Sequence, residues 1–257
     1  MTARYVRITT PSGGAWALAD GERAVVLDGA PWNGGAPTLT EEAFPLSAAR
    51  LDCPVAPRTI FGIGKNYRAH ASEMGGPVPT EPLVFAKTTS SLLAPNGTVV
   101  LPRISKRVDY EGELGVVIGK RARHVPVERA LDYVFGYTVL CDVTARDLQK
   151  SDGQWTRAKG FDTFCPTGPA VVTGIDPSSL ALRLSVNGDK RQDGNTKDMV
   201  FDVATLVAHL STFATLEPGD LIATGTPEGV GPLSPGDAVE IEIERIGVLA
   251  FRVAAED

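Results

Sequence analysis

Short apolar stretches, separated by Gly, Pro and Asn-Gly pairs, run along this chain and restrict what it can fold into. Stretches such as "RTIFGIG", "GELGVVIG" and "YTVLCDV" have the length and the β-branched content of buried strands. Segments with helical periodicity are fewer, and they do not alternate regularly with the strands, so a doubly wound parallel sheet is disfavoured. We therefore predict a β-rich α+β fold.

The N-terminal part of the chain has a different pattern from the rest. Residues 4–28 alternate in short runs and predict a small β-meander. Residues 29–58 are rich in Pro, Gly and Ala, which favours a linker or hinge. We therefore expect a small N-terminal β domain with its linker at residues 1–57 and a larger catalytic domain at residues 58–257, a division that a chain of 257 residues allows.

Helices and one hairpin are expected within the larger part. Asn187-Gly188 predicts a tight turn between two strands. An apolar stripe at helical spacing is formed by Val203, Leu206, Val207, Leu210 and Phe213. Helices are predicted at residues 66–74, at 126–136, at 144–149 with Thr144 as the N-cap, and at 202–216.

Composition excludes several classes of function. The net charge of −6, without a basic block, argues against nucleic acid as a partner. No apolar run approaches the length of a membrane span, and the N-terminal "MTARYVRITT" does not resemble a signal peptide. Three scattered cysteines, Cys53, Cys141 and Cys165, fit a reducing cytoplasm better than a disulfide framework. We therefore expect a cytoplasmic protein that acts on small molecules.

Two glutamates precede the apolar run of "DYEGELGVVIG". Because alternate residues of a strand face the same way, Glu111 and Glu113 point to one side. Asp142 ends a second apolar strand and raises the same question. Buried carboxylates need a compensating cation, and oxygen ligands favour Mg²⁺, Mn²⁺ or Ca²⁺. The alternative is a solvated strand face, with Asp142 capping the helix that follows.

His70 and Glu73 are spaced to be neighbours on one face of a helix. A carboxylate beside an imidazole can fix its tautomer and stabilise its charged form, as a general base requires. An incidental pair on a surface helix is the alternative.

Two glycine-rich segments partly match the patterns of nucleotide-binding loops. "GIGKNY" places Tyr67 where the third glycine of a dinucleotide-binding turn belongs, and no regular βαβ unit surrounds it, so that function is disfavoured. "GTPEGVG", residues 225–231, lacks the Gly-Lys-Ser/Thr of a P-loop. It favours an anion site made by backbone amides and the hydroxyl of Thr226.

Five segments occur in an order that resembles the fumarylacetoacetate hydrolase family: "GIGKNYRAHASEMG", "DYEGELGVVIG", "GYTVLCDVTARDLQ", "WTRAKGFDTFCPTGP" and "GTPEGVG". The resemblance covers roughly residues 58–245. It implies a roll of mixed β-strands around a central metal site, a homodimer, and Mg²⁺ or Mn²⁺ as cofactor. It also implies a 2-oxo acid as substrate.

The resemblance also implies roles for individual residues. Glu111, Glu113 and Asp142 would be the metal ligands, and Lys159 would face the substrate and the developing enolate. The remaining roles are distributed as follows: Arg146 and Gln149 would bind the distal group of the substrate, Thr226 would hold the carboxylate next to the keto group, and His70 and Glu73 would form a catalytic dyad on a mobile lid.

The activity expected from the resemblance is hydrolysis of a C–C bond in an acylpyruvate such as fumarylpyruvate or acetylpyruvate, through a pyruvate enolate. Oxaloacetate decarboxylation and isomerisation or decarboxylation of a 5-carboxymethyl-2-hydroxymuconate derivative are alternatives on the same site. A non-catalytic, metal-dependent 2-oxo acid binding protein is an alternative of a different class. Binding alone needs no general base, so the intact pair of His70 and Glu73 argues against it.

Overall fold

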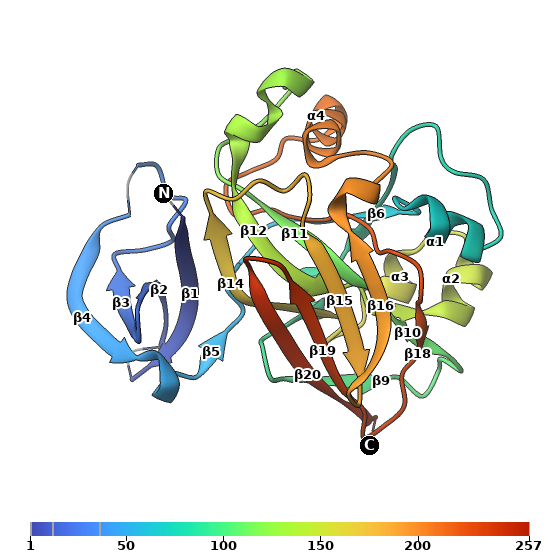
Figure 1. Ribbon diagram of the computed structural model, residues 1–257, viewed down its shortest axis with the longest axis horizontal. Coiled ribbons are helices and arrows are strands. Elements are labelled where there is room, and N and C mark those ends of the chain that lie inside the picture. The colour runs from blue at the N-terminus through green and yellow to red at the C-terminus, as the bar shows by residue number, and fades with distance from the viewer. Residues whose placement is uncertain (1, 12, 36, 257) are drawn as a thin grey trace.

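The computed structural model describes residues 2–11, 13–35 and 37–256 and has a β-rich α+β fold, as predicted (Figure 1). Strands account for 44% of the residues and helices for 17%. The largest of three sheets has twelve strands, ten of them in the order β4-β3-β2-β1-β14-β12-β11-β17-β6-β7, with β5 paired to β1 and β8 to β14. A five-stranded sheet has the order β16-β15-β19-β20-β9, and a three-stranded one the order β13-β10-β18.

The strands of the first half of the chain are β1 Ala3–Thr10, β2 Gly13–Asp20, β3 Arg23–Leu27, β4 Leu39–Pro45, β5 Leu51–Asp52, β6 Ile60–Gly64, β7 Leu83–Lys87, β8 Leu92–Leu93, β9 Thr98–Leu101, β10 Val108–Tyr110 and β11 Gly112–Ile118. The second half contributes β12 Val134–Cys141, β13 Thr144–Ala145, β14 Cys165–Thr173, β15 Ala181–Val186, β16 Asp189–Asn195, β17 Leu221–Ala223, β18 Gly231–Pro232, β19 Ala238–Ile243 and β20 Gly247–Ala255. The helices are α1 Arg68–Glu73, α2 Arg146–Asp152, α3 Thr156–Lys159 and α4 Val203–Phe213, with 3-10 turns η1 Leu46–Ala48, η2 Thr89–Ser91, η3 Val127–Tyr133 and η4 Thr196–Asp198.

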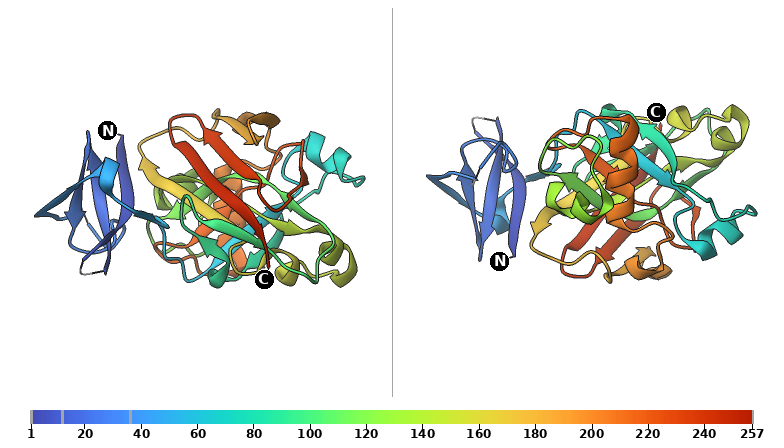
Figure 2. Two further views of the ribbon diagram at one scale, coloured as in Figure 1. Left: turned by 90° about the horizontal axis from the view of Figure 1, so that it is seen from below. Right: turned by 90° about the horizontal axis from the view of Figure 1, so that it is seen from above.

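The predicted N-terminal meander is present and stands at one end of the molecule (Figure 2). Strand β1 also pairs antiparallel with β14, from Ala3 opposite Thr173 to Tyr5 opposite Val171, so the meander extends the large sheet. The prediction of a linker at residues 29–58 was wrong in part, because this segment contains β4, β5 and η1. The Pro, Gly and Ala residues of this segment are typical of loops, but the segment includes the edge strand β4, which pairs with β3.

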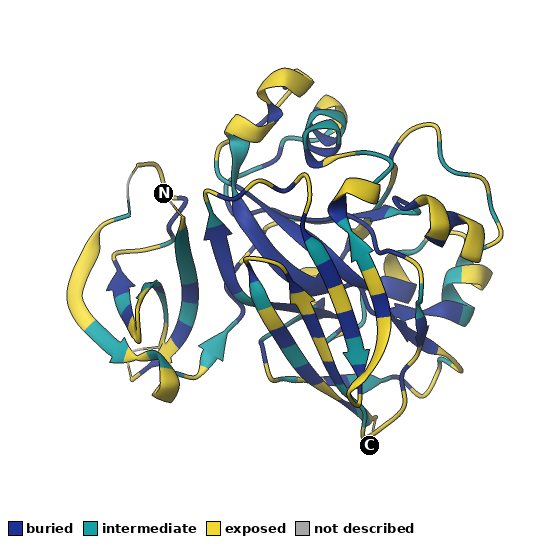
Figure 3. Cartoon of the chain, viewed as in Figure 1, coloured by how far each residue is buried: buried dark blue, intermediate teal, exposed yellow. Residues whose placement is uncertain are grey.

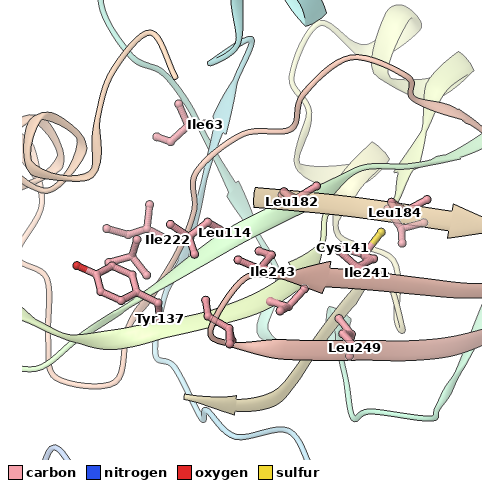
Figure 4. Close-up of a cluster of buried hydrophobic side chains, with 14 of the residues drawn as sticks. Ile63, Leu114, Tyr137, Cys141, Leu182, Leu184, Ile222, Ile241, Ile243 and Leu249 are labelled. Atoms are coloured by element: carbon pink, nitrogen blue, oxygen red, sulfur yellow. The ribbon is translucent and has the colours of Figure 1, made fainter. Parts of the chain in front are cut away.

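The main core lies where the large sheet faces the five-stranded one (Figure 4). Strand β11 is buried along its whole length, as expected of a strand in the middle of a sheet. Its Leu114 belongs to the main core, whereas Val117, on the other face, belongs to a second cluster. Strands β15 and β19 bury about every second residue and leave the others partly or fully exposed (Figure 3), which is the pattern of a sheet with one solvated face.

One helix prediction was wrong, and another was right except for the last residue of its apolar stripe. The segment expected as a helix at residues 126–136 is the 3-10 turn η3, after which β12 begins at Val134. Helix α4 forms as predicted, and the first four residues of its stripe are buried, but Phe213 is 54% exposed because the helix ends there. Among the residues that the structure describes, no helix is both long enough and apolar enough to cross a membrane.

Helices α1, α2 and α3 gather at the end of the molecule far from the N-terminal meander (Figure 1). The hairpin of β15 and β16 turns at Asn187 and Gly188 as predicted, and both residues have positive φ. The carboxylates and the predicted dyad lie on or beside the elements at this end.

Candidate active site

The strand register brings the three predicted metal ligands together. Gly112 on β11 pairs with Cys141 on β12, and just before this pair the backbone N–H of Asp142 donates to the carbonyl of Glu111 at 2.8 Å. One carboxylate oxygen from each of Glu111, Glu113 and Asp142 lies within 4.8 Å of the others. All three residues are buried, with at most 4% of their surface exposed. The alternative of a solvated strand face therefore does not hold.

Lys159, the last residue of α3, bonds two of the three carboxylates. Its Nζ donates to Oε2 of Glu111 at 3.0 Å, to Oδ2 of Asp142 and to Oγ1 of Thr144 at 2.9 Å. It also lies 4.7 Å from the ring centre of Phe85, a cation–π contact. The predicted capping role of Thr144 was wrong, because the side chain receives Lys159 and donates to the carbonyl of Asp142 instead, and α2 has no side-chain cap.

Two further cations surround these carboxylates. Nζ of Lys87, whose side chain is fully buried, donates to Oδ1 of Asp142 at 2.8 Å and to the carbonyl of Phe164 at 3.1 Å. Sequence reasoning missed Lys87; the available signal was its place as the last residue of the apolar strand "LVFAK".

Arg146 on α2 is held by acceptors on three sides. Its guanidinium donates to Oδ2 of Asp109 at 2.8 Å, to Oε1 of Glu111 at 2.6 Å and to Oε1 of Gln149 at 2.6 Å. Asp109, which the sequence analysis also passed over, is buried and additionally accepts from Arg107. Arg146 and Gln149 thus lie together at the site, but the guanidinium is committed to protein acceptors.

The arrangement separates the pKa values of the two glutamates. Burial raises the pKa of Glu113 well above its usual range, and the nearby charges of Asp142 and Glu111 raise it further. For Glu111 burial acts in the same direction, but Lys159 and Arg146 outweigh it, and its pKa falls well below normal. Burial would lower the pKa of Lys159, yet Asp142 and Glu111 prevail and raise it. Of the two glutamates, Glu113 is therefore the one whose negative charge is not balanced by nearby cations among the described residues.

The residues present fit a divalent metal ion. The donor set consists of three carboxylates, which are the hard oxygen ligands of Mg²⁺ and Mn²⁺. Within the described ranges Glu113 has no ion-pair partner, and its Oε2 accepts a hydrogen bond of 2.7 Å from the backbone N–H of Gly225. A cation bound at these oxygens would supply the positive counter-charge that the buried carboxylate of Glu113 lacks.

The predicted dyad lies on α1. Nδ1 of His70 is 3.0 Å from Oε2 of Glu73, and His70 is buried. An ionised carboxylate can only accept, so this hydrogen bond assigns the proton to Nδ1 and leaves Nε2 free to act as a base. An incidental surface pair would not bury the imidazole.

A cavity of about 190 Å³ joins these groups. The predicted site residues on its wall are His70, Glu111, Glu113, Arg146, Gln149, Lys159 and Thr226. The cavity wall also includes Ile63, Gly64, Lys65, Met74, Lys150 and Trp155, which the sequence analysis did not single out. The volume suits a small metabolite, and cationic, acidic and apolar groups all reach it.

Thr226, in the glycine-rich segment, is a buried residue of the cavity wall. Its hydroxyl donates to the carbonyl of Gly112 at 2.9 Å and accepts from Nε2 of Gln192 at 2.8 Å. A substrate carboxylate would have to compete with Gly112 for this proton. Gln192 also accepts from the N–H of Gly112, so it ties the glutamate strand to the segment of Thr226.

The "GIG" segment is explained by packing. A Cβ atom at Gly64 would lie 2.5 Å from the ring of Trp155, and one at Gly62 would lie 2.2 Å from the ring of Phe85. Both aromatic rings therefore press directly on the backbone of β6, and they contact each other at 5.5 Å. The glycines make room for an aromatic wall beside Lys159, and they need no nucleotide to account for them.

Comparison with known proteins agrees with this geometry. The family model described as "Fumarylacetoacetate (FAA) hydrolase C-terminal" matches residues 59–254, and one described as "Rv2993c-like, N-terminal" matches residues 3–54. Protein Rv2993c of Mycobacterium tuberculosis is 46% identical over 254 residues, which cover 96% of each chain.

Solved structures agree as well. A crystal structure of 2-hydroxyhepta-2,4-diene-1,7-dioate isomerase from Mycobacterium marinum is 42% identical, with a TM-score of 0.92 and 99% of each chain covered. Maleylpyruvate hydrolase from Sphingobium sp. SYK-6, in complex with manganese(II) and pyruvate, is 33% identical, with a TM-score of 0.81, over 99% of this chain and 100% of that one. With its acidic triad and these relatives, the chain belongs to the fumarylacetoacetate hydrolase family and is an enzyme of that family's metal-dependent type.

Proposed function

We propose that the protein hydrolyses the C–C bond of an acylpyruvate, a 2,4-dioxo acid, to a carboxylic acid and pyruvate. The observation that carries this proposal is the cavity wall on which His70 and Lys159 meet Glu111 and Glu113, whose carboxylates form the acidic triad with Asp142. Hydrolysis of such a bond needs a base for water and a cationic environment for an enolate. Both are present within one small cavity.

Metal binding at Glu111, Glu113 and Asp142 is part of the proposal, with Mg²⁺ or Mn²⁺ as the ion. When bound, such an ion polarises the 2-oxo group and neutralises developing negative charge. Lys159 now bonds Glu111 and Asp142, so its ammonium would give up these oxygens and turn toward the substrate. Manganese and pyruvate in the maleylpyruvate hydrolase structure support this choice of ion and product.

The protein's own groups would carry the proton transfers. Nε2 of His70 takes a proton from a water molecule, whose oxygen attacks the acyl carbonyl carbon, while Glu73 stabilises the imidazolium through Nδ1. The tetrahedral adduct then collapses: the bond between the acyl carbon and C3 of the pyruvate unit breaks, and its electron pair forms the enolate. Lys159 stabilises the enolate oxygen, and transfer of the proton held by the His70 imidazolium to C3 completes pyruvate and restores the neutral base.

Steady-state assays test this proposal. Purified protein should convert acetylpyruvate or fumarylpyruvate to pyruvate in Mg²⁺ or Mn²⁺, and exhaustive chelation should abolish the conversion. A protein that binds oxalate in Mg²⁺ yet turns over none of the acylpyruvates, oxaloacetate or hydroxymuconates would instead be the non-catalytic binding protein.

Isomerisation of a hydroxymuconate-type diene is a second candidate. It is favoured by the relative from Mycobacterium marinum, whose name is that of a 2-hydroxyhepta-2,4-diene-1,7-dioate isomerase. In that reaction His70 would move a proton from the 2-hydroxyl oxygen to a carbon of the diene, and no C–C bond would be cleaved. Proton NMR of the products separates the two reactions, because only hydrolysis releases pyruvate.

A further inference from the structure

The groups expected to hold the far end of the substrate are already occupied. Arg146 was predicted to bind this distal group, yet its guanidinium donates to Asp109, Glu111 and Gln149. Moving it away from Asp109 and Glu111 would take one charged partner from each of two buried carboxylates, which is costly. Another cation on the cavity wall is therefore better placed to receive a distal group.

Two lysines of the cavity wall are unpaired. Lys65 and Lys150 both line the cavity, and neither side chain has an ion pair or hydrogen bond among residues 2–11, 13–35 and 37–256. Lys150 is exposed on α2, one residue after Gln149, whereas Lys65 is half-buried. An ammonium group that borders a partly closed cavity without a counter-charge is suited to bind an anion there.

The backbone holds Lys65 in an unusual position. It follows β6 directly and has a φ of 55°, in the left-handed region that residues with a side chain seldom adopt. A Cβ atom built on Gly76 would lie only 2.4 Å from Nζ of Lys65. The absence of a side chain at Gly76 therefore makes room for the ammonium. Lys65 is thus directed along the segment that follows α1.

The same cavity also has apolar side chains on its wall. Ile63, Met74 and Trp155 line the cavity together with the two lysines. Apolar side chains suit a short unsaturated carbon chain, and they would disfavour a second charge close to the reacting carbons. The cavity therefore combines carboxylates, apolar side chains and two lysines without a counter-charge in the described part of the chain.

We propose that Lys65 and Lys150 bind a carboxylate at the distal end of the substrate, which makes the substrate a dicarboxylic acylpyruvate such as fumarylpyruvate rather than a neutral-tailed one such as acetylpyruvate. This inference rests on the proposed acylpyruvate hydrolysis and specifies its substrate class. It assigns the two lysines to specificity and leaves Arg146 to hold Glu111.

The test compares the two substrates in Lys65→Met, Lys150→Met and the control Lys120→Met. Lys120 is exposed beyond the far end of β11 and provides the same change of charge and length. In the wild type, kcat/KM should be higher for fumarylpyruvate than for acetylpyruvate. The ratio of the two values should fall by about 10- to 100-fold in each site variant, because a charge-assisted hydrogen bond is lost. Lys150→Arg should retain most of the ratio, as should Lys120→Met.

A binding measurement separates failure of this inference from failure of the proposed hydrolysis. Calorimetry in Mg²⁺ would compare oxalate, which has no distal carboxylate, with 2-oxoadipate, which has one. The affinity for 2-oxoadipate relative to oxalate should fall in Lys65→Met and Lys150→Met even if no acylpyruvate is turned over. Equal ratios in the site variants and in Lys120→Met, in both measurements, would overturn the assignment.

Discussion

The backbone N–H of Gly229 donates a hydrogen bond of 3.1 Å to Oε1 of Glu73. Glu73 thus links the helix of the dyad to the glycine-rich segment, while its other oxygen holds His70. Glu73 therefore bonds both His70 and Gly229, and its side chain is 34% exposed. The bond between Gly229 and Glu73 therefore holds the predicted lid against the glycine-rich segment at a point that solvent can reach.

Hydrogen exchange should report this fastening. In the wild type, exchange at residues 69–74 should slow when oxalate and Mg²⁺ are added, because a closed lid shields the cavity. Glu73→Ala should raise exchange there in the absence of ligand, whereas Glu73→Gln keeps an oxygen acceptor for Gly229 and should raise it less. Buried amides of α4 serve as the internal control. Equal protection of residues 69–74 with and without ligand would contradict a moving lid.

Replacement of His70 should separate two chemistries. His70→Ala should reduce acylpyruvate hydrolysis by about 10²- to 10⁴-fold, the usual contribution of a general base. Decarboxylation of oxaloacetate passes through the same enolate without water and should fall much less. Glu73→Gln should follow the same pattern more mildly, because the imidazole remains. The measurement is kcat for both substrates; an equal loss in both would make lid closure, and not water activation, the main role of His70.

Removal of one ligand should have opposite effects on the metal-free and metal-loaded protein. Glu113 is buried without an ion-pair partner in the described structure, so Glu113→Gln should raise the stability of the metal-free protein by about 1–3 kcal/mol. The wild type should gain about 2.7 kcal/mol when Mg²⁺ is at 100 times its Kd. The variant should lose most of this gain. Denaturant unfolding with and without Mg²⁺ measures both effects, and an undiminished gain in the variant would exclude Glu113 as a ligand.

Lys159→Met tests the cation that faces the substrate. Its ammonium bonds Glu111 and Asp142, the oxygens proposed for the metal, so Mg²⁺ should bind the variant as tightly as the wild type or more tightly. Binding of 2-oxo acids and turnover should both weaken, because the enolate loses a fixed positive charge. Calorimetry of Mg²⁺ and of oxalate, with kinetics, checks the pair of outcomes. Unchanged kinetics would remove Lys159 from the site.

Lys87→Met should act mainly on stability. Its side chain is fully buried, and Asp142 would lose a partner at 2.8 Å, so the metal-free protein should be destabilised by about 3–5 kcal/mol. Lys106→Met, an exposed lysine, should change stability by less than about 0.5 kcal/mol. Addition of Mg²⁺ should recover part of the loss at Lys87, since the ion would provide Asp142 with another counter-charge. The same loss at both lysines would contradict the role of Lys87.

The sequence predicted what depends on spacing. The period of a strand places Glu111 and Glu113 on one side, and the spacing of His70 and Glu73 makes them neighbours, so both pairs could be found without a structure. The partners of Arg146 could not be found, because Asp109 and Glu111 reach it only through tertiary packing.

Two predictions about helices were wrong because tertiary contacts or a neighbouring strand decided the local conformation. The first helix after β11 is a 3-10 turn, because its segment is short and leads directly into β12 at Val134. Thr144 had the residue type of a helix cap, but a buried ammonium, that of Lys159, engages its hydroxyl instead. Neither outcome is visible in a window of neighbouring residues.

The pairing of β1 with β14 distinguishes an evolutionary unit from a folding unit. The two family matches meet between residues 54 and 59, as if the chain could be cut there. A chain that began after this point would leave the β14 backbone at Val171–Thr173 without its hydrogen-bonding neighbour. Bare strand edges recruit other chains, so such a fragment should be prone to aggregate. The N-terminal meander thus also serves as a permanent cover for the catalytic sheet.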